Sequence, residues 1–231
     1  MAMKKQKHGV AGFSLVELLI GTILFTVITG VAFSLLVSSL FRYQGESTVT
    51  EAFQQANVAL DQIVRDVHSA GYPPRSSLNA AVASNNPDQY ALPFAWTPSY
   101  PGTACTVGGT CTVPGEYDLI VEADLGNGVQ WIRYSLVGTT LMRGVAPKVR
   151  FQDPVAATSS MVPYLDNVMN GSTSLPMFSY VFDSGTITQT PSDIRQVNVS
   201  LIVRSLQPDP QTKQFRTITL TGQAVRFNPN Q

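Results

Sequence analysis

The feature that most constrains this chain is an uncharged apolar run near its N-terminus. Residues 18–41 carry no charged side chain. At about 1.5 Å of rise per residue, a helix over this run measures roughly 36 Å, enough to cross a hydrocarbon core of about 30 Å. Glu17 stands at the start of the run, and a carboxylate in lipid is costly. A plain anchor has no need of this acid, so Glu17 is a candidate functional residue.

The residues before the run determine its orientation. Lys4, Lys5 and Lys7 precede it without any acid, and positive charge retains that end on the cytoplasmic side. A secretory signal peptide has an apolar region of about 7 to 15 residues with its small-residue cleavage site after it. Here Ala11 and Gly12 precede a longer run. A protease that cuts at this point leaves the apolar segment on the mature chain, and an uncleaved signal anchor is the alternative.

The segment Gly12-Phe13-Ser14-Leu15-Val16-Glu17 resembles the processing site of type IV prepilins and the related pseudopilins. The resemblance implies that a prepilin peptidase cleaves between Gly12 and Phe13 and methylates the new amine of Phe13. It also implies that Glu17 is the assembly acid, which neutralises the amine of a neighbouring subunit and offsets the cost of burying both charges. The alternative is that Glu17 only extends to the membrane interface.

The implied domain plan has four parts. Residues 1–12 form a leader peptide, 13–41 a transmembrane and assembly helix, 42–71 its amphipathic continuation, and 72–231 an extracytoplasmic head rich in β-strands. Spacings of three and four residues predict one buried face in the continuation, while Asp66 and other polar residues are placed on the wet side. Gly71 followed by Tyr72 and two prolines predicts the end of the helix. A free coiled coil is the alternative for this half. The predicted buried face is Val49, Phe53, Ala56, Leu60, Ile63 and Val67.

The head is predicted to be an antiparallel sheet packed on the N-terminal helix, which makes the fold class α+β and resembles the pilin fold. Period-two alternation favours Ile132, Tyr134 and Leu136 as the buried face of one strand. A short helix is expected at 164–169, a turn at 207–210, and long loops over 73–114 and 146–176. Strands are expected at 117–122, 129–137, 139–143 and 177–182, around Val197 to Val203, and through Ile218, Leu220, Val225 and Phe227.

The two cysteines, Cys105 and Cys111, flank a Gly-Gly turn. In a chain whose bulk lies outside the cytoplasm, this spacing predicts a disulfide that closes a small loop. A redox motif requires Cys-x-x-Cys and a structural zinc site requires four ligands. Neither pattern occurs in the sequence, so the prediction is a structural disulfide.

Motifs for catalysis are missing from the sequence. It has no Gly-x-Ser-x-Gly, no His-Glu-x-x-His and no phosphate-binding glycine loop, so we expect no enzyme and no cofactor. Glu122, Asp124 and Asn127 offer oxygen ligands for calcium, but turn chemistry beside Gly126 and Gly128 explains them equally. Loss of the leader lysines leaves 12 basic and 15 acidic residues. A net charge of −3 gives no electrostatic argument for nucleic-acid binding.

Two further segments resemble the same families. Residues 65–72, which end in Ala70-Gly71-Tyr72, resemble minor pilins of the PilW type, and Tyr134 to Gly138 with Leu141 and Arg143 resembles a segment of minor pilins and pseudopilins. The resemblance implies a minor type IV pilin of the inner membrane that reaches the cell surface in a pilus or in its tip or initiation complex.

The resemblance also implies the partners of such a protein, which are major and minor pilin subunits, the prepilin peptidase, the pilus assembly platform and the inner membrane. Two alternatives stay open. One is a minor pseudopilin of a type II secretion system, which has the same stalk and a comparable head. The other is a membrane-anchored extracytoplasmic binding or enzymatic domain with an uncleaved anchor.

Overall fold

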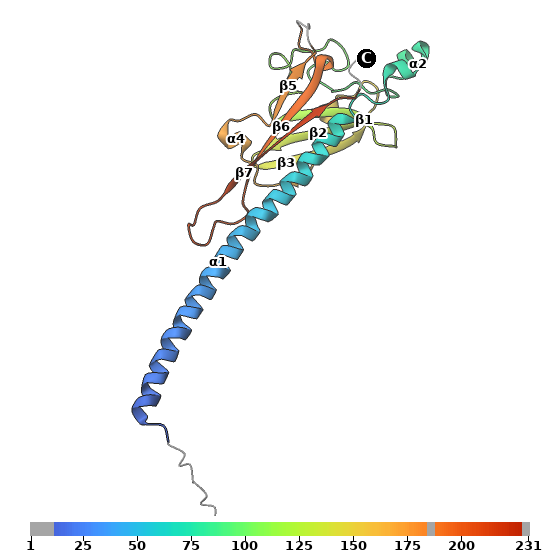
Figure 1. The fold of residues 1–231 in the computed structure, drawn as a ribbon. Coiled ribbons are helices and arrows are strands. Elements are labelled where there is room, and N and C mark those ends of the chain that lie inside the picture. Colours follow the sequence, from blue (N-terminus) through green and yellow to red (C-terminus); the bar gives the residue numbers. More distant parts are fainter. Residues whose placement is uncertain (1–11, 184–187, 228–231) are drawn as a thin grey trace, which may run out of the picture.

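A computed structural model describes residues 12–183 and 188–227. A single long helix, α1 (Leu15–His68), carries a β-rich head at its C-terminal end (Figure 1). The α+β layout predicted from the sequence is therefore confirmed at this level. Residues 1–11, which belong to the predicted leader peptide, lie outside the described residues, so that role stays a prediction.

The helix α1 is continuous over 54 residues. Its sequence contains no proline, and three glycines are tolerated at a cost of about 1 kcal/mol each relative to alanine. It ends one turn before Gly71, which adopts a φ of 79°, a conformation that glycine reaches without a steric penalty. The predicted end of the helix at 71 is thus confirmed to within three residues.

The head contains two antiparallel sheets where one was expected. The first has the order β1 (Asp118–Asp124), β2 (Val129–Val137), β3 (Thr140–Pro147) and β4 (Val162–Leu165). The second has the order β5 (Phe178–Phe182), β6 (Ile194–Arg204) and β7 (Thr217–Val225). An isolated bridge between Val168 and Val203 links them. Short helices lie in the connections: η1 (Arg75–Ser77), α2 (Ala80–Asn85), α3 (Pro154–Ala157), α4 (Asn170–Thr173) and η2 (Pro191–Asp193).

The upper half of α1 packs into the core that both sheets share. Its buried face is dominated by small residues, Ala52, Ala56 and Ala59, which let the sheet backbones approach the helix closely. Two expectations about this face are wrong. Phe53 is 43% exposed, whereas Asp66 is only 3% exposed because β2 and β3 supply polar partners for it.

The prediction for the buried face of β2 is confirmed at Ile132 and Tyr134, while Leu136 is half-buried, but the opposite face is not left open. Ile132 and Tyr134 are buried as expected, but Trp131 on the opposite face is buried too. A second apolar cluster of Ala95, Ile120 and Trp131 covers that face, because loop segments fold over it.

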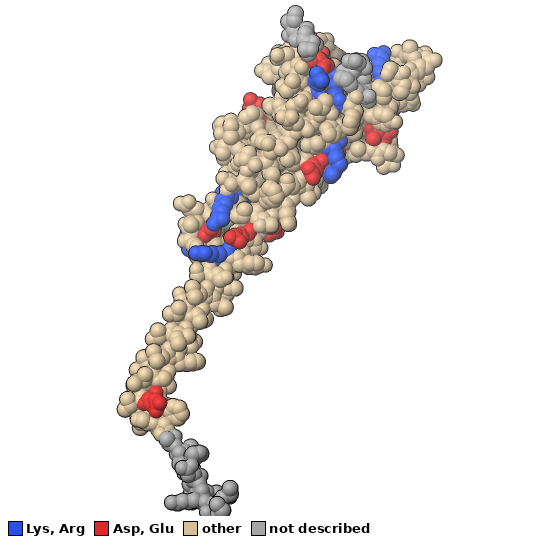
Figure 2. Space-filling model, in the orientation of Figure 1, with Lys and Arg blue, Asp and Glu red and all other residues tan. Residues whose placement is uncertain are grey.

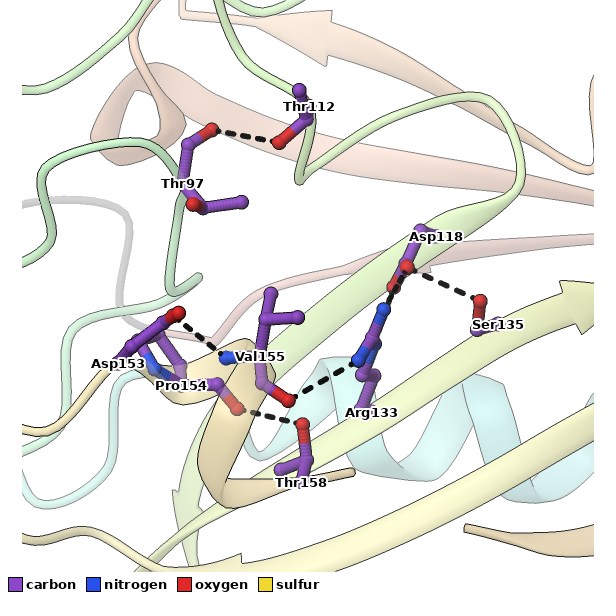
Figure 3. Close-up of polar contacts among 9 residues, drawn as sticks. All are labelled: Thr97, Thr112, Asp118, Arg133, Ser135, Asp153, Pro154, Val155 and Thr158. Carbon is purple, nitrogen blue, oxygen red and sulfur yellow. Dashed lines mark hydrogen bonds and ion pairs between the residues drawn. The ribbon is translucent and has the colours of Figure 1, made fainter. Parts of the chain in front are cut away.

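Polar contacts hold those covering segments in place (Figure 3). Arg133 on β2 donates to Asp118 on β1 and also to the carbonyl oxygen of Val155 in α3, at 3.3 Å. Asp153 caps α3 by accepting from the amide of Val155 at 3.0 Å. The outer face of the first sheet is therefore held to α3 through Arg133 on the inner strand β2.

Two more local expectations differ from the structure. The helix expected at 164–169 is wrong, since Val162–Leu165 forms β4 and pairs with β3, while the helix begins later, at Asn170. The strand expected through Ile218, Leu220, Val225 and Phe227 forms as β7 but ends at Val225, and Val225 and Phe227 are 42% and 76% exposed.

Candidate functional site

The lower part of α1 is an apolar rod without any cover from the head. Every residue from 12 to 36 is exposed. Within the described residues, α1 is the one helix long and apolar enough to cross a membrane. Figure 2 shows that this rod carries no basic side chain, and that acidic side chains, drawn in red, occur on it only near its N-terminal end. An exposed apolar surface of this size is stable only in lipid or against other helices.

The predicted processing residues lie at the open end of this rod. Gly12 and Phe13 precede α1, and both are exposed. Ser14 occupies the N-cap position and Glu17 lies in the first turn. A negative charge in the first turn interacts favourably with the positive end of the helix dipole. The structure thus places Glu17 one turn from the residue that would carry the new amine after cleavage.

Three threonines within the rod form hydrogen bonds from their hydroxyl groups to carbonyl oxygens of the same helix. Thr22 donates to the carbonyl oxygen of Leu19 at 2.9 Å, and Thr26 to that of Thr22 at 2.7 Å. Thr29 donates in the same way to Phe25 at 2.8 Å. Because these hydroxyls are satisfied within the helix, the rod carries no unmet side-chain donor at these positions that would oppose burial in an apolar medium.

The upper end of α1 is joined to the first sheet by a buried carboxylate. Tyr134 on β2 donates to Oδ2 of Asp66 at 2.6 Å, and Arg143 on β3 donates to the same oxygen at 3.1 Å. Gln62 donates to Oδ1 of Asp66 at 2.7 Å. Burial, and then the negative charge of Asp66, raise the pKa of Tyr134 well above its ordinary value. In the folded protein Tyr134 therefore remains a hydrogen-bond donor above the pH at which an ordinary tyrosine loses its proton.

Sequence reasoning placed Asp66 on the wet side and so missed this junction. A signal for it was nevertheless present. Asp66 belongs to one of the segments that resemble pilins, and Tyr134 and Arg143 belong to the other. The structure brings the two segments together through these three side chains.

A second junction lies lower on α1, where the β6–β7 connection reaches the helix. Gly45 is buried, and a Cβ atom at that position would lie 3.4 Å from Oδ2 of Asp209. Backbone amides of Thr212 and Gln211, together with Arg216, lower the pKa of Asp209. The expected turn at 207–210 thus forms part of a loop that contacts α1 close to the end of its apolar rod.

The acidic residues considered as calcium ligands, Glu122 and Asp124, are engaged in contacts within the head. Glu122 is fully buried and pairs with Lys148 at 2.7 Å, and it also accepts from Trp131 at 3.0 Å and from Tyr100. Asp124 accepts from the amides of Gly126 and Gly128 at 2.7 and 3.1 Å. The turn interpretation therefore accounts for Asp124. Among the described residues, no group of three or more His, Cys, Asp or Glu side chains is placed to hold a metal ion.

The cysteine prediction is confirmed. Cys105 and Cys111 form a disulfide with a Cα–Cα distance of 5.0 Å. The loop that it closes lies against the remainder of the head, since the amide of Val107 donates to the carbonyl oxygen of Gln189 at 3.0 Å. The bridge therefore fixes one end of the long connection between α1 and β1.

Comparisons of the chain with protein-family models, with curated proteins and with solved structures give no match. Its function is therefore argued from the residues and the geometry described above.

Proposed function

We propose that this chain is a minor type IV pilin, similar to the PilW type. A prepilin peptidase cuts it after Gly12, and its N-terminal helix then carries it from the inner membrane into a pilus or its tip or initiation complex. Glu17 and the amine of Phe13 are the assembly groups. The partners are other pilin subunits and the assembly platform.

The observation that carries the proposal is the form of α1 together with its N-terminal motif. An exposed apolar rod starts directly after Gly12-Phe13, has its acid in the first turn, and continues without a break into the head. A simple anchor requires only the apolar rod. Two fixed junctions with the head, at Asp66 and at Gly45, allow a force applied to the rod to move the head with it.

The head supports a role in assembly over a role in catalysis. Its buried polar groups are used for internal pairing, as in Glu122 with Lys148 and Asp66 with Arg143. The resemblance of the Asp66 and Tyr134 segments to minor pilins adds to this argument, since these segments meet at the upper junction. A pseudopilin of a secretion system shares these features and stays the alternative.

The experiment is to determine the N-terminus of the protein purified from membranes, by intact mass and terminal peptide sequencing. We expect the chain to start at Phe13 and to carry an added methyl group on its amine. A start at Met1 or Ala2, in a host with an active prepilin peptidase, would overturn the proposal and favour the anchored domain. Loss of pili, against loss of secretion, in a deletion strain then separates the pilin from the pseudopilin.

A further inference from the structure

The strand β7 forms one margin of the second sheet and runs beside the upper half of α1 (Figure 1). Three contacts fix its direction. Asp209 lies near Gly45, Gly222 lies against Leu60, and Phe227 stacks on His68 at 5.1 Å. Positions along β7 therefore rise together with positions along α1, and the two elements run parallel.

The hydrogen-bond register shows which backbone groups of β7 point away from the sheet. The amide of Arg226 donates to β6 at Arg195, and the carbonyl oxygen of Arg216 accepts from Ser205. Both β7-side residues have even numbers, so alternation turns the even residues toward β6 and the odd residues outward. The outward residues are all exposed. They are Thr217, Thr219, Thr221, Gln223 and Val225.

The outward amides and carbonyls of these five residues make no hydrogen bond to any residue that the structure describes. Natural edge strands are usually protected by charges, prolines, bulges or a short length. From Thr217 to Val225 there is no charge and no proline, and the pairing with β6 continues without a bulge over nine residues. This edge therefore has none of the usual protection against strand addition.

The other sheet margins in the described part of the chain are each covered or shortened. Bridges from Phe94 and Tyr72 occupy the outer side of β1. The strand β4 has four residues and contains Pro163. In β5, the amide of Phe178 donates to Glu116, and a register shift interrupts the strand near Phe182. Among the sheet margins in the described part of the chain, β7 is therefore the one that is long, regular and not covered by another segment.

An uncovered apolar side chain on the helix marks the same place. Leu60 and Val64 contact Gly222 on β7, and Phe53 lies on the same helix face because it is seven residues, or about two turns, before Leu60. Because α1 and β7 run parallel, Phe53 lies at the level of the start of β7. Its side chain is 43% exposed. A strand laid against β7 would cover it.

We propose that β7 is a docking edge, to which an extended strand from the head of a different pilin subunit adds by main-chain hydrogen bonds. This inference rests on the proposed function, which supplies the neighbouring subunit. The added strand takes its main-chain bonds from the five outward residues and presents uncharged side chains toward them. At the lower end an apolar side chain covers Phe53.

The direction of β7 argues against a second copy of this chain as the partner. Two β7 edges that pair in the antiparallel sense are related by a two-fold axis across the strands, which reverses the strand direction. Because α1 runs parallel to β7, such a pair would point its apolar rods in opposite directions. Chains whose rods share one membrane cannot adopt that arrangement. An antiparallel pair of β7 edges from two copies is thus excluded within one membrane, and the proposal assigns the added strand to a different subunit.

The test compares hydrogen exchange of the full chain in its assembled complex with exchange of the same chain as a monomer in detergent. We expect the amides of Thr219, Thr221 and Gln223 to exchange at least tenfold more slowly in the complex. The amides of Leu220 and Gly222 should be protected in both samples. Equal exchange of the odd amides in both samples would overturn the proposal.

A matched pair of variants separates main-chain recognition from side-chain contact. Thr219→Pro removes an amide that the fold does not use, whereas Thr219→Val keeps it. We expect Thr219→Pro to reduce incorporation into the complex at least tenfold and Thr219→Val to leave it unchanged, with both variants retaining their unfolding midpoint. Equal incorporation of the two folded variants would overturn the proposal, and the exchange measurement decides it if Thr219→Pro unfolds.

A photo-crosslinker at Thr221 identifies the partner. A product with a strand of another pilin-like protein supports the proposal, and a product with a second copy of this chain overturns it. Glu17→Gln serves as the reference for the proposed function. If Glu17→Gln blocks incorporation and Thr219→Pro does not, the pilin assignment stands and the docking edge fails.

Discussion

Tyr134 donates a 2.6 Å hydrogen bond to Asp66 across 68 residues of sequence, and this bond joins the end of the long helix to the middle of the first sheet. Asp66 is 3% exposed and also receives Arg143 and Gln62. A buried carboxylate with several donors is stable only while the donors remain. The junction is therefore a cooperative group of side chains.

The first prediction concerns this group. Tyr134→Phe removes one charge-assisted donor and should lower the free energy of unfolding by about 1.5–3 kcal/mol. Urea unfolding of the full chain in detergent measures the change. Tyr164→Phe is the control, because Tyr164 stacks on Tyr134 at 6.1 Å and its change should stay within about 0.5 kcal/mol. Equal effects of the two substitutions would mean that the bond to Asp66 contributes nothing specific.

The second prediction concerns the buried pair of Glu122 and Lys148. Their side chains are 0% and 5% exposed, at a separation of 2.7 Å. Lys148→Met leaves the carboxylate of Glu122 buried without its partner and should cost about 3–5 kcal/mol in the free energy of unfolding. Adding Glu122→Gln should recover at least half of that loss, since Trp131 and Tyr100 can still donate to the amide oxygen. Additive losses in the double variant would contradict this account.

The third prediction tests the close approach of α1 and β7. A Cβ atom on Gly222 would lie 2.9 Å from Cδ1 of Leu60 and 3.3 Å from Cγ2 of Val64. Gly222→Ala should therefore cost about 1–3 kcal/mol through overpacking. Gly45→Ala is the control, since its Cβ makes only ordinary contacts with Asp209 and alanine is favoured in a helix by about 1 kcal/mol. Thermal unfolding should move in opposite directions for the two variants.

The fourth prediction is a loss of stability at high pH. Burial raises the pKa of Tyr134, Tyr100 and Tyr180 in the folded protein, whereas in the unfolded chain each pKa is about 10. Their contribution to stability is complete below about pH 10 and is lost as the pH rises above it, because only the unfolded chain releases these protons. The tyrosinate absorbance of these three buried side chains should appear together with unfolding.

Tyr134→Phe supplies the control for this pH dependence. With one buried tyrosine fewer, the fall of the unfolding free energy above pH 10 should be shallower by about 1.4 kcal/mol per pH unit. The difference in tyrosinate absorbance between the parent chain and Tyr134→Phe isolates this one hydroxyl. A difference that rises near pH 10 while the head remains folded would show that the Tyr134 hydroxyl is accessible, and it would contradict the burial on which the prediction rests.

The sequence was sufficient for the elements whose signal is local. The apolar run, the helical spacing and Gly71 predicted α1 to within two residues at its N-terminal end and three at its C-terminal end. Alternation predicted β6, and the Cys105–Cys111 spacing predicted the disulfide. These signals depend on neighbours in the chain, so they survive without any knowledge of the tertiary arrangement.

The features that the sequence did not predict depend on distant partners. Asp66 reads as a surface residue until Tyr134 and Arg143 are placed beside it. Trp131 lies on the polar face of its strand by alternation, but it is buried because loop residues fold over that face. Phe53 fits the buried helical face by spacing, yet its side chain is 43% exposed because no other part of the described chain covers it. Local periodicity carries no information on such coverage.

The fifth prediction concerns Glu17, which lies in the first turn of α1 on the exposed apolar rod. On the proposed function, its carboxylate meets the amine of Phe13 of a neighbouring subunit where water is scarce, so loss of the charge leaves that amine unpaired. Mass measurement should show that the Glu17→Gln and Glu17→Ala proteins both start at Phe13. Both should nevertheless be at least tenfold less abundant in sheared filaments, which corresponds to a loss of about 1.4 kcal/mol in the free energy of incorporation. Glu46→Gln, an exposed acid above the apolar rod, should incorporate normally. Normal incorporation of both Glu17 variants would leave Glu17 no role in assembly, because a pairing of charges in an apolar medium cannot be removed without a cost.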